Sequence, residues 1–467
     1  MRTPEAGPMK ALDDLLARRI YLGVTGLSRA GKTVFVTSLI HNLLRADASA
    51  EDSPLRGFDC FDEGRLIGAM LRHDANATVP EFPYRKAMQA ITGESPQWPE
   101  PTRGISRIRI DLRYRRTDAG LTGQAATRLG LRDATLQLEI VDYPGEWLVD
   151  LPLLGTDFET WSAAMIEQAR QGTRADLSRE WLAFVQDRKP DAEHDEDWAE
   201  QASALYADYL RACSEARLRN LQPGRFLHPA DLRGASVLRF CPLPDLRGKA
   251  APGSIHAAFR DKFRDYQEKV VRTFYRQHFA GLDRQIVLVD ALSALNDGQE
   301  AFDDQSEALA AILQSFRHGR NSLLGWLMGR RISKVLFAAT KADHVIRGDR
   351  LHLENLTRRM LHVLDENNAI KTSAETHVQA IASVRATRDT RRADTGREIL
   401  VGRRPEDSHE LPLEPGAIPL DFPPDWAALD YRFWDFQPHP DPSWKHSGFP
   451  TLRLPEVLNL LIGDDLT

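Results

Sequence analysis

The fold is decided by the stretch Gly26-Leu27-Ser28-Arg29-Ala30-Gly31-Lys32-Thr33. It fits the pattern G-x-x-x-x-G-K-[ST] and lies between an apolar run typical of a buried strand and an apolar run without a helix breaker. Its two glycines allow main-chain N–H groups and the N-terminus of the following helix to point at one anion. The stretch therefore predicts a phosphate-binding loop between a strand at 19–25 and a helix that ends near Arg45.

Each polar side chain of this loop has an expected task in holding a nucleotide. Lys32 would neutralise the β- and γ-phosphates, and the Thr33 hydroxyl would be a ligand of Mg²⁺. Arg29 is a candidate for an arginine that stabilises charge on the γ-phosphate, although such a residue is more often a solvated loop cation. The residues expected to contact the nucleotide here are Ser28, Arg29, Ala30, Gly31, Lys32, Thr33 and Val34.

Length and composition indicate a globular, multi-domain chain. The 467 residues, 42% of them hydrophobic, can bury the cores of two or three domains. No window approaches the roughly 20 consecutive apolar residues of a membrane span, and no signal-peptide core is present. Three cysteines without metal-ligand spacing favour a reducing, cytosolic location. The net charge of -6 argues against a general nucleic-acid coat, and we expect no sequence-specific nucleic-acid contact.

A second motif, Asp142-Tyr143-Pro144-Gly145, fits D-x-x-G at the end of an apolar strand expected at 136–142. Asp142 would hold Mg²⁺ through water, and the N–H of Gly145 would bond to the γ-phosphate. Glu146 follows, where many nucleotide switches have a Gln that orients the attacking water. A carboxylate there could accept a proton but would repel the γ-phosphate, so we expect slow hydrolysis.

A third motif, Thr340-Lys341-Ala342-Asp343, follows a buried strand expected at 334–339 and fits [NT]-K-x-D, the guanine reader of P-loop proteins. The two oxygens of Asp343 match the N1–H and 2-amino donors of guanine, whereas adenine presents a lone pair. Thr340 stands where Asn is usual, which weakens strict guanine specificity. The residues expected around the base are Thr340, Lys341, Asp343, His344 and, after a last strand at 377–382, Ser383, Val384 and Arg385.

The rest of the chain sets the expected organisation. Helical spacing of aromatic residues between 155 and 280, such as Phe259, Phe263 and Phe274, predicts a helical insertion. We expect an α/β fold with a mostly parallel sheet flanked by helices, a large mainly α-helical inserted domain and an irregular C-terminal extension. The expected parts are 1–150 and 281–386 (nucleotide-binding domain), 151–280 (insertion) and 387–467 (Arg/Pro-rich extension).

Further helices are expected at 65–73, 303–316, 349–367 and 454–462, the first inside an otherwise irregular passage that ends at Pro101. The basic, amphipathic stretch 317–331 is compatible with peripheral contact to an acidic membrane surface. Because its apolar run is short, a helix lying on the sheet with its cations in water is the favoured interpretation.

The order of these motifs is that of a Ras-like GTPase, and four stretches resemble the YcjX-like family of bacterial stress-associated P-loop proteins. They are Gly26 to Thr33, Asp142 to Leu148, Leu221 to Leu227 and Ala338 to His344. The resemblance spans most of the chain. It implies a Ras-like nucleotide domain with a large helical insertion, binding of GTP and GDP, and a cytosolic role in a stress response.

Within the family pattern, Trp98-Pro99 followed by Thr102 resembles the first switch of such proteins. Thr102 would then coordinate Mg²⁺ only when a γ-phosphate is present, and Arg103 beside it is a second candidate arginine. A threonine that simply enters a strand is an equal alternative.

Three functional hypotheses follow. The favoured one is a slow GTPase whose switch segments, 80–102 and 145–154, signal to the insertion and through it to a protein effector. An ATPase of similar mechanism stays open because of Thr340. The third is a nucleotide-stabilised scaffold that hardly turns over.

Overall fold

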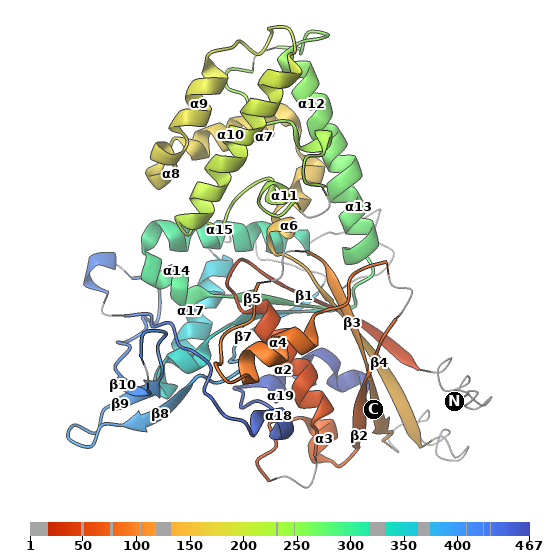
Figure 1. Cartoon of the computed structure of the whole chain (residues 1–467), viewed down its shortest axis with the longest axis vertical. Helices are drawn as coiled ribbons and strands as arrows, with labels where there is room; N and C mark the ends of the chain where they lie inside the picture. The colour runs from red at the N-terminus through yellow and green to blue at the C-terminus, as the bar shows by residue number, and fades with distance from the viewer. Residues whose placement is uncertain are drawn as a thin grey trace.

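A seven-stranded sheet lies at the centre of the computed structural model (Figure 1). The structure describes residues 17–47, 51–74, 78–101, 104–117, 132–229, 232–246, 248–316, 332–362, 374–407, 409–423, 425–429 and 431–467. The strands are β1 (Arg18–Gly26), β2 (Leu66–Arg72), β3 (Ser106–Arg115), β4 (Asp133–Asp142), β5 (Arg284–Val289), β6 (Lys334–Ala339) and β7 (Glu375–Ala380). Their order across the sheet is β2-β3-β4-β1-β5-β6-β7.

Six strands of this sheet run in one direction, and β3, between β2 and β4, runs in the other. β1 pairs in parallel with β4 and β5, and β6 pairs in parallel with β5 and β7, while β3 is antiparallel to both β2 and β4. This is the predicted Ras-like α/β architecture. Because the carboxyl ends of parallel strands meet at one edge, the loops after β1, β4, β6 and β7 converge there.

Helices cover both faces of the sheet, which explains why its central strands are apolar along their whole length. One face packs on α2 (Lys32–Leu44) and on α19 (Leu454–Ile462) near the end of the chain. The other packs on α14 (Ala291–Asp297), α15 (Gln299–Ser315) and α17 (Arg350–His362). The strand predicted at 334–339 and the helix predicted at 454–462 are confirmed at both ends.

The insertion forms a lobe of helices beyond the sheet (Figure 1). Its helices are α7 (Phe158–Ala169), α8 (Gly172–Leu177), α9 (Arg179–Gln186), α10 (Glu196–Glu215), α11 (Gly224–Leu227), α12 (Ile255–Tyr266) and α13 (Arg272–Phe274). Aromatic rings fill its core: Trp161 stacks on Phe263 at 4.9 Å between ring centroids. The helical face predicted from Phe259, Phe263 and Phe274 is buried.

The helix predicted at 65–73 is wrong, because these residues form strand β2. Apolar residues at 66, 67, 70 and 71 have helical spacing, but β3 offers an open edge, and β2 pairs with it in antiparallel register. Tertiary hydrogen bonding overrides the local pattern, and Ile67 and Met70 stay exposed. The passage predicted as irregular up to Pro101 also contains α3 (Asp59–Asp62) and α4 (Tyr84–Thr92).

The C-terminal extension wraps over the sheet domain and contains elements that the sequence did not indicate. Strands β8 (Thr387–Arg391), β9 (Glu398–Gly402) and β10 (Leu411–Leu413) form a small antiparallel sheet. A short helix, α18 (Trp444–Ser447), precedes α19. Arginines and carboxylates cross this small sheet in pairs, as in Arg388 with Glu410 and Arg392 with Glu414, which explains the arginine-rich composition.

Several expectations fall outside the described residues. They concern Thr102, Arg103 and the basic stretch 317–331. Within the parts of the chain that the structure describes, no helix combines the length and apolar character needed to cross a bilayer.

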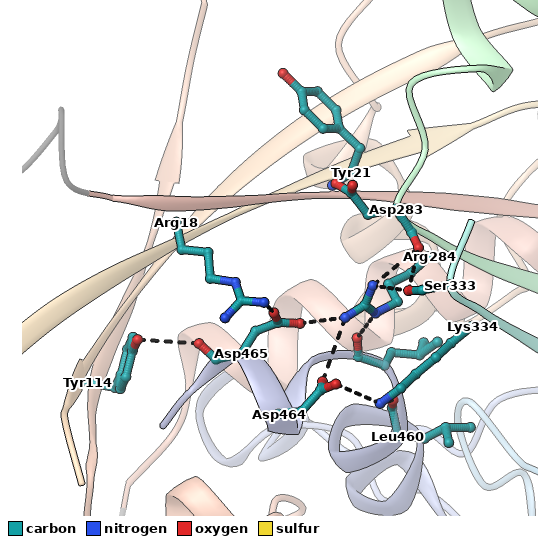
Figure 2. Close-up of polar contacts among 11 residues, drawn as sticks. Arg18, Tyr21, Tyr114, Asp283, Arg284, Ser333, Lys334, Leu460, Asp464 and Asp465 are labelled. Carbon is teal, nitrogen blue, oxygen red and sulfur yellow. Dashed lines mark hydrogen bonds and ion pairs between the residues drawn. The ribbon is translucent and has the colours of Figure 1, made fainter. Parts of the chain in front are cut away.

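The chain end is anchored to the strands by ion pairs at the sheet edge opposite the phosphate-binding loop. Figure 2 shows Asp465 between Arg18 of β1 and Arg284 of β5, and Asp464 facing Lys334 of β6. The Arg284 Nη2 to Asp465 Oδ2 distance is 2.9 Å, and the Asp465 side chain is 1% exposed. Asp464 is 51% exposed.

This difference in burial gives a test of the anchor. Replacing Asp465 (D465A) should lower the free energy of unfolding by about 3 kcal/mol, because the largely buried charge of Arg284 loses its closer, buried carboxylate. The neighbouring change D464A should cost less than about 1 kcal/mol, since water screens the exposed pair with Lys334. Chemical denaturation of both variants measures the difference, and equal losses would contradict the anchoring role of Asp465.

Candidate functional site

The predicted phosphate-binding loop leads directly from β1 into α2. Gly31 has φ +84°, a left-handed conformation that favours glycine, and α2 begins at Lys32. A Cβ built on Gly31 would have no heavy atom within 4 Å, so open space lies over the loop at this point. Lys32 and Thr33 are both buried. The Lys32 Nζ donates to the carbonyl of Gly26 at 2.6 Å, which holds the ammonium inside the loop.

The D-x-x-G motif lies against this loop. The Tyr143 N–H donates to the Val24 carbonyl at 3.2 Å. A Cβ added to Gly145 would approach the main chain of Gly26 and Leu27 to 2.6–2.8 Å, so only glycine fits. The close approach sets the Gly145 main chain beside the loop that would hold the phosphates.

Glu146 follows and reaches back onto the loop. Its Oε1 accepts hydrogen bonds from both the N–H and the Oγ of Ser28, each at 2.8 Å. Burial alone would raise the pKa of Glu146. The positive charges of Lys32 and His228, together with the hydrogen bonds, outweigh burial, so the pKa lies below its ordinary value. The carboxylate is therefore ionised at neutral pH, inside a site built for anions.

The residues expected to hold Mg²⁺ fit that ion. Asp142 ends β4 with 1% exposure, and the Thr33 hydroxyl donates to the carbonyl of Glu100 at 3.2 Å. Both are hard oxygen donors, which Mg²⁺ prefers. Among the described residues, no group of three or more His, Cys, Asp and Glu side chains could hold a metal alone. Mg²⁺ would therefore draw its remaining ligands from phosphates and water.

The predicted base-reading residues also lie together. Asp343 is 1% exposed, and its Oδ2 accepts the N–H of Ala386 at 2.7 Å. The Ala342 N–H donates to the Ile381 carbonyl at 3.0 Å, which joins this loop to the segment after β7. His344 is buried against the rings of Phe433 and Phe436, and burial lowers its pKa.

Two contacts bring the base-reading region to the phosphate-binding helix. Ser38, on α2, donates from its Oγ to the carbonyl of Ser383. Val34, in the first turn of α2, packs on the cluster that contains Val384. Ser38 follows Thr33 by about 8 Å along the helix at 1.5 Å per residue. The two predicted regions are therefore within reach of one nucleotide.

Sequence reasoning missed the groups that hold Lys341 in place. Lys341 has φ +61°, and its Nζ donates to Asp290 at 2.7 Å and lies 4.6 Å from the Phe433 ring centroid. Asp290 ends the apolar run of β5, a position that could have drawn attention to it. Phe433 and Phe436 come from the C-terminal extension, and the Trp98 indole N–H donates to the Phe436 carbonyl at 2.6 Å. No local pattern marks these three aromatic residues as neighbours.

The next two arginines were predicted for different tasks: Arg29 for charge on the γ-phosphate, and Arg385 for contact near the base. Arg29 is exposed in a left-handed conformation, with φ +69°. Arg385 pairs with Asp389 at 3.3 Å and lines a cavity of about 460 Å³ shared with Arg56, Trp444 and Arg453. Arg219 of the insertion is a buried cation. Burial lowers the pKa of Arg219, and the charges of Glu146 and Asp290 oppose that shift.

The insertion contacts the segment after the D-x-x-G motif through hydrogen bonds that sequence analysis did not anticipate. The segment forms α6 (Glu146–Val149) and ends at Asp150. Asp150 accepts the Gly224 N–H at 2.8 Å and the Tyr266 hydroxyl at 2.6 Å. The Gln222 side chain donates to the Val149 carbonyl at 2.7 Å. A movement of α6 would therefore change its hydrogen bonds with the insertion.

Comparison with known proteins agrees with this architecture. The model of the YcjX-like family, DUF463, matches residues 20–466. A protein of Escherichia coli (strain K12) named Ras-like GTPase YcjX is 38% identical over 460 residues, 96% of this chain and 96% of that protein. A protein of the same name from Shewanella oneidensis is 35% identical over 472 residues, with 96% and 95% covered.

Asp150 gives a pH-dependent test of the contact with the insertion. Burial raises its pKa to about 7, against the hydrogen bonds from Tyr266 and Gly224. Between its ordinary pKa and about 7, the folded chain keeps a proton that the unfolded chain releases. This residue therefore lowers the free energy of unfolding as pH rises, by at most ~1.4 kcal/mol per pH unit.

Replacing Asp150 (D150N) removes this contribution, so the variant should gain stability relative to the wild type between pH 5 and pH 7 in urea unfolding. Asp157→Asn is the matched control. Hydrogen bonds from Thr160 lower the Asp157 pKa, so it stays ionised across that range and its effect should be constant. A difference for D150N that does not change with pH would contradict the buried, proton-holding state of Asp150.

Proposed function

Since the chain belongs to the YcjX-like family, we propose that it is a guanine-nucleotide-binding protein that hydrolyses GTP slowly with Mg²⁺. One observation carries the proposal: the hydrogen bond from Ser38 to the Ser383 carbonyl, which joins the phosphate-binding helix to the base-reading region. A nucleotide has its phosphates at one end and its base at the other, so both regions must lie close together. The names of the two relatives, Ras-like GTPase, support the same activity.

In this proposal the chain's own groups position the triphosphate and its base. Lys32 and the N–H groups at the start of α2 hold the β- and γ-phosphates, and the Gly145 N–H bonds to the γ-phosphate. Asp343 accepts the N1–H and 2-amino donors of guanine. Mg²⁺, held by Thr33 and Asp142 and in the triphosphate state by Thr102, would neutralise phosphate charge.

Slow hydrolysis follows from the charge of Glu146. An ionised carboxylate at this position of the switch segment repels the γ-phosphate and offers no amide to orient the attacking water. The proposed protein therefore spends long periods in each nucleotide state, as a switch does. The contacts of Asp150 and Gln222 across the insertion support a readout of that state by the helical lobe, and through it by a protein effector.

The proposal also covers the place of the protein in the cell. We assign the protein to the cytosol on its cysteine usage, and to a bacterial stress response on the family resemblance alone. Peripheral membrane contact through 317–331 stays the less favoured alternative.

An ATPase of the same mechanism is the second candidate, and one observation favours it. The Thr340 hydroxyl donates to the Val289 carbonyl at 3.2 Å, and Thr340 has no side-chain amide to support the base loop. The choice of purine then depends chiefly on Asp343.

Replacing Asp343 (D343N) tests the choice of base while keeping the side-chain shape. The amide would place a donor against the donors of guanine, so GDP affinity should fall about 100-fold, the effect of losing charge-assisted hydrogen bonds. Xanthine carries an acceptor at position 2, so XDP affinity should rise. Calorimetric titration of GDP, XDP and ADP measures this, with the exposed change D187N as control. Equal wild-type affinities for GDP and ADP would contradict guanine recognition.

Replacing Lys32 (K32A) separates an enzyme from a scaffold. Single-turnover hydrolysis of radiolabelled GTP with Mg²⁺ should be slow but measurable in the wild type and should fall to background in K32A, because the ammonium that offsets phosphate charge is gone. The exposed lysine change K189A should leave the rate unaltered. A wild-type rate no higher than that of K32A would leave only the scaffold.

A further inference from the structure

The carboxylate of Glu146 accepts a hydrogen bond from a main-chain N–H of the phosphate-binding loop. Its Oε1 accepts the N–H and the hydroxyl of Ser28, and the side chain is 4% exposed. N–H groups of such loops bind phosphate oxygens. The buried Glu146 carboxylate therefore takes a hydrogen bond that a phosphate oxygen could otherwise accept.

Its position in the chain indicates which phosphate it opposes. Glu146 directly follows Gly145, whose main chain packs on Gly26 and Leu27. Gly145 is the residue expected to contact the γ-phosphate, whereas the β-phosphate is expected at Lys32 and the start of α2. The carboxylate therefore lies on the γ-phosphate side of the loop. Two negative groups within a few Å of each other repel strongly in a buried site.

The other nucleotide-binding groups of the loop are also bonded to the protein. Lys32 donates to the Gly26 carbonyl, and Thr33 donates to the Glu100 carbonyl. These two acceptors are neutral main-chain oxygens, which an anionic phosphate or a magnesium ion would replace readily. The acceptor for Ser28 is the charged carboxylate of Glu146, and hydrogen bonds to charged groups are about twice as strong as those between neutral groups.

We propose that Glu146 is a specificity determinant of the phosphate site, which makes the protein prefer a nucleoside diphosphate to a triphosphate. This inference rests on the proposed function. A diphosphate leaves the carboxylate on Ser28, and a triphosphate must displace it. The preference is thus set by a side chain of the switch segment and not by the loop that holds the phosphates.

The insertion also packs against Glu146 and its neighbour Trp147. A Cβ added to Gly224 would lie 2.2 Å from the Glu146 carbonyl oxygen, so the loop of the insertion packs directly on this residue. The Arg225 guanidinium lies 3.4 Å from the centroid of the Trp147 ring. A displacement that moved the main chain of Glu146 or the Trp147 ring would therefore also disturb this packing, which would strengthen the preference for a diphosphate.

The test compares the affinities of the full chain for GDP and for a non-hydrolysable GTP analogue with Mg²⁺. The wild type should bind GDP more tightly. In E146Q the bond to Ser28 becomes neutral, so the ratio of analogue Kd to GDP Kd should fall tenfold or more. The exposed change E180Q removes the same charge from α9 and should leave the ratio unaltered.

A second variant covers the case in which E146Q does not fold. S28A keeps the carboxylate but removes one of its two hydrogen bonds, so the ratio should fall about threefold. An unchanged ratio in these variants, with GDP binding intact, would overturn the inference alone. Failure of the wild type to bind either guanine nucleotide would overturn the proposed function as well.

Discussion

The structure depends on one electrostatic need: the N–H groups and the ammonium at the start of α2 require anionic or carbonyl acceptors. Their geometry follows from the turn at Gly31 and from β1, which delivers the loop to the carboxyl edge of the sheet. The strands that end at the same edge bring Asp142 and the base-reading loop there as well. A parallel sheet therefore assembles one binding site from segments that are hundreds of residues apart.

The insertion packs on the segment that follows the D-x-x-G motif. The segment after β4 lies between the phosphate-binding loop on one side and the insertion on the other. Gly145 contacts the loop, and Asp150 is buried under Gly224 and Tyr266. Such an element has few intermediate positions, which is a property of switches that respond to small changes at a ligand.

Sequence patterns predict the parts of this molecule whose cause is local. The buried strand at 334–339 and the amphipathic helix at 454–462 depend on their own residues, and their bounds are confirmed. The local pattern of β2 predicts a helix. Its conformation is instead determined by its partner β3, which begins 34 residues further along the chain. The small sheet of the C-terminal extension escaped prediction for the same reason, since its short strands are held by pairing and by ion pairs.

The residues of the candidate site also fall into those that the sequence predicts and those that it does not. The motif residues could be predicted because each carries its chemistry in a short pattern, and the structure brings them together at one edge. Asp290, Asp150 and Phe433 could not, since each acts through a partner far away in the sequence. Their roles depend on distances that only the folded chain defines.

A crystal structure of the chain with GDP and Mg²⁺ tests the central claim most directly. The account predicts one nucleotide with its diphosphate on the N–H groups of Gly31, Lys32 and Thr33 and its guanine edge on the Asp343 carboxylate. A base that lies elsewhere, with Asp343 bonded only to Ala386, would contradict it.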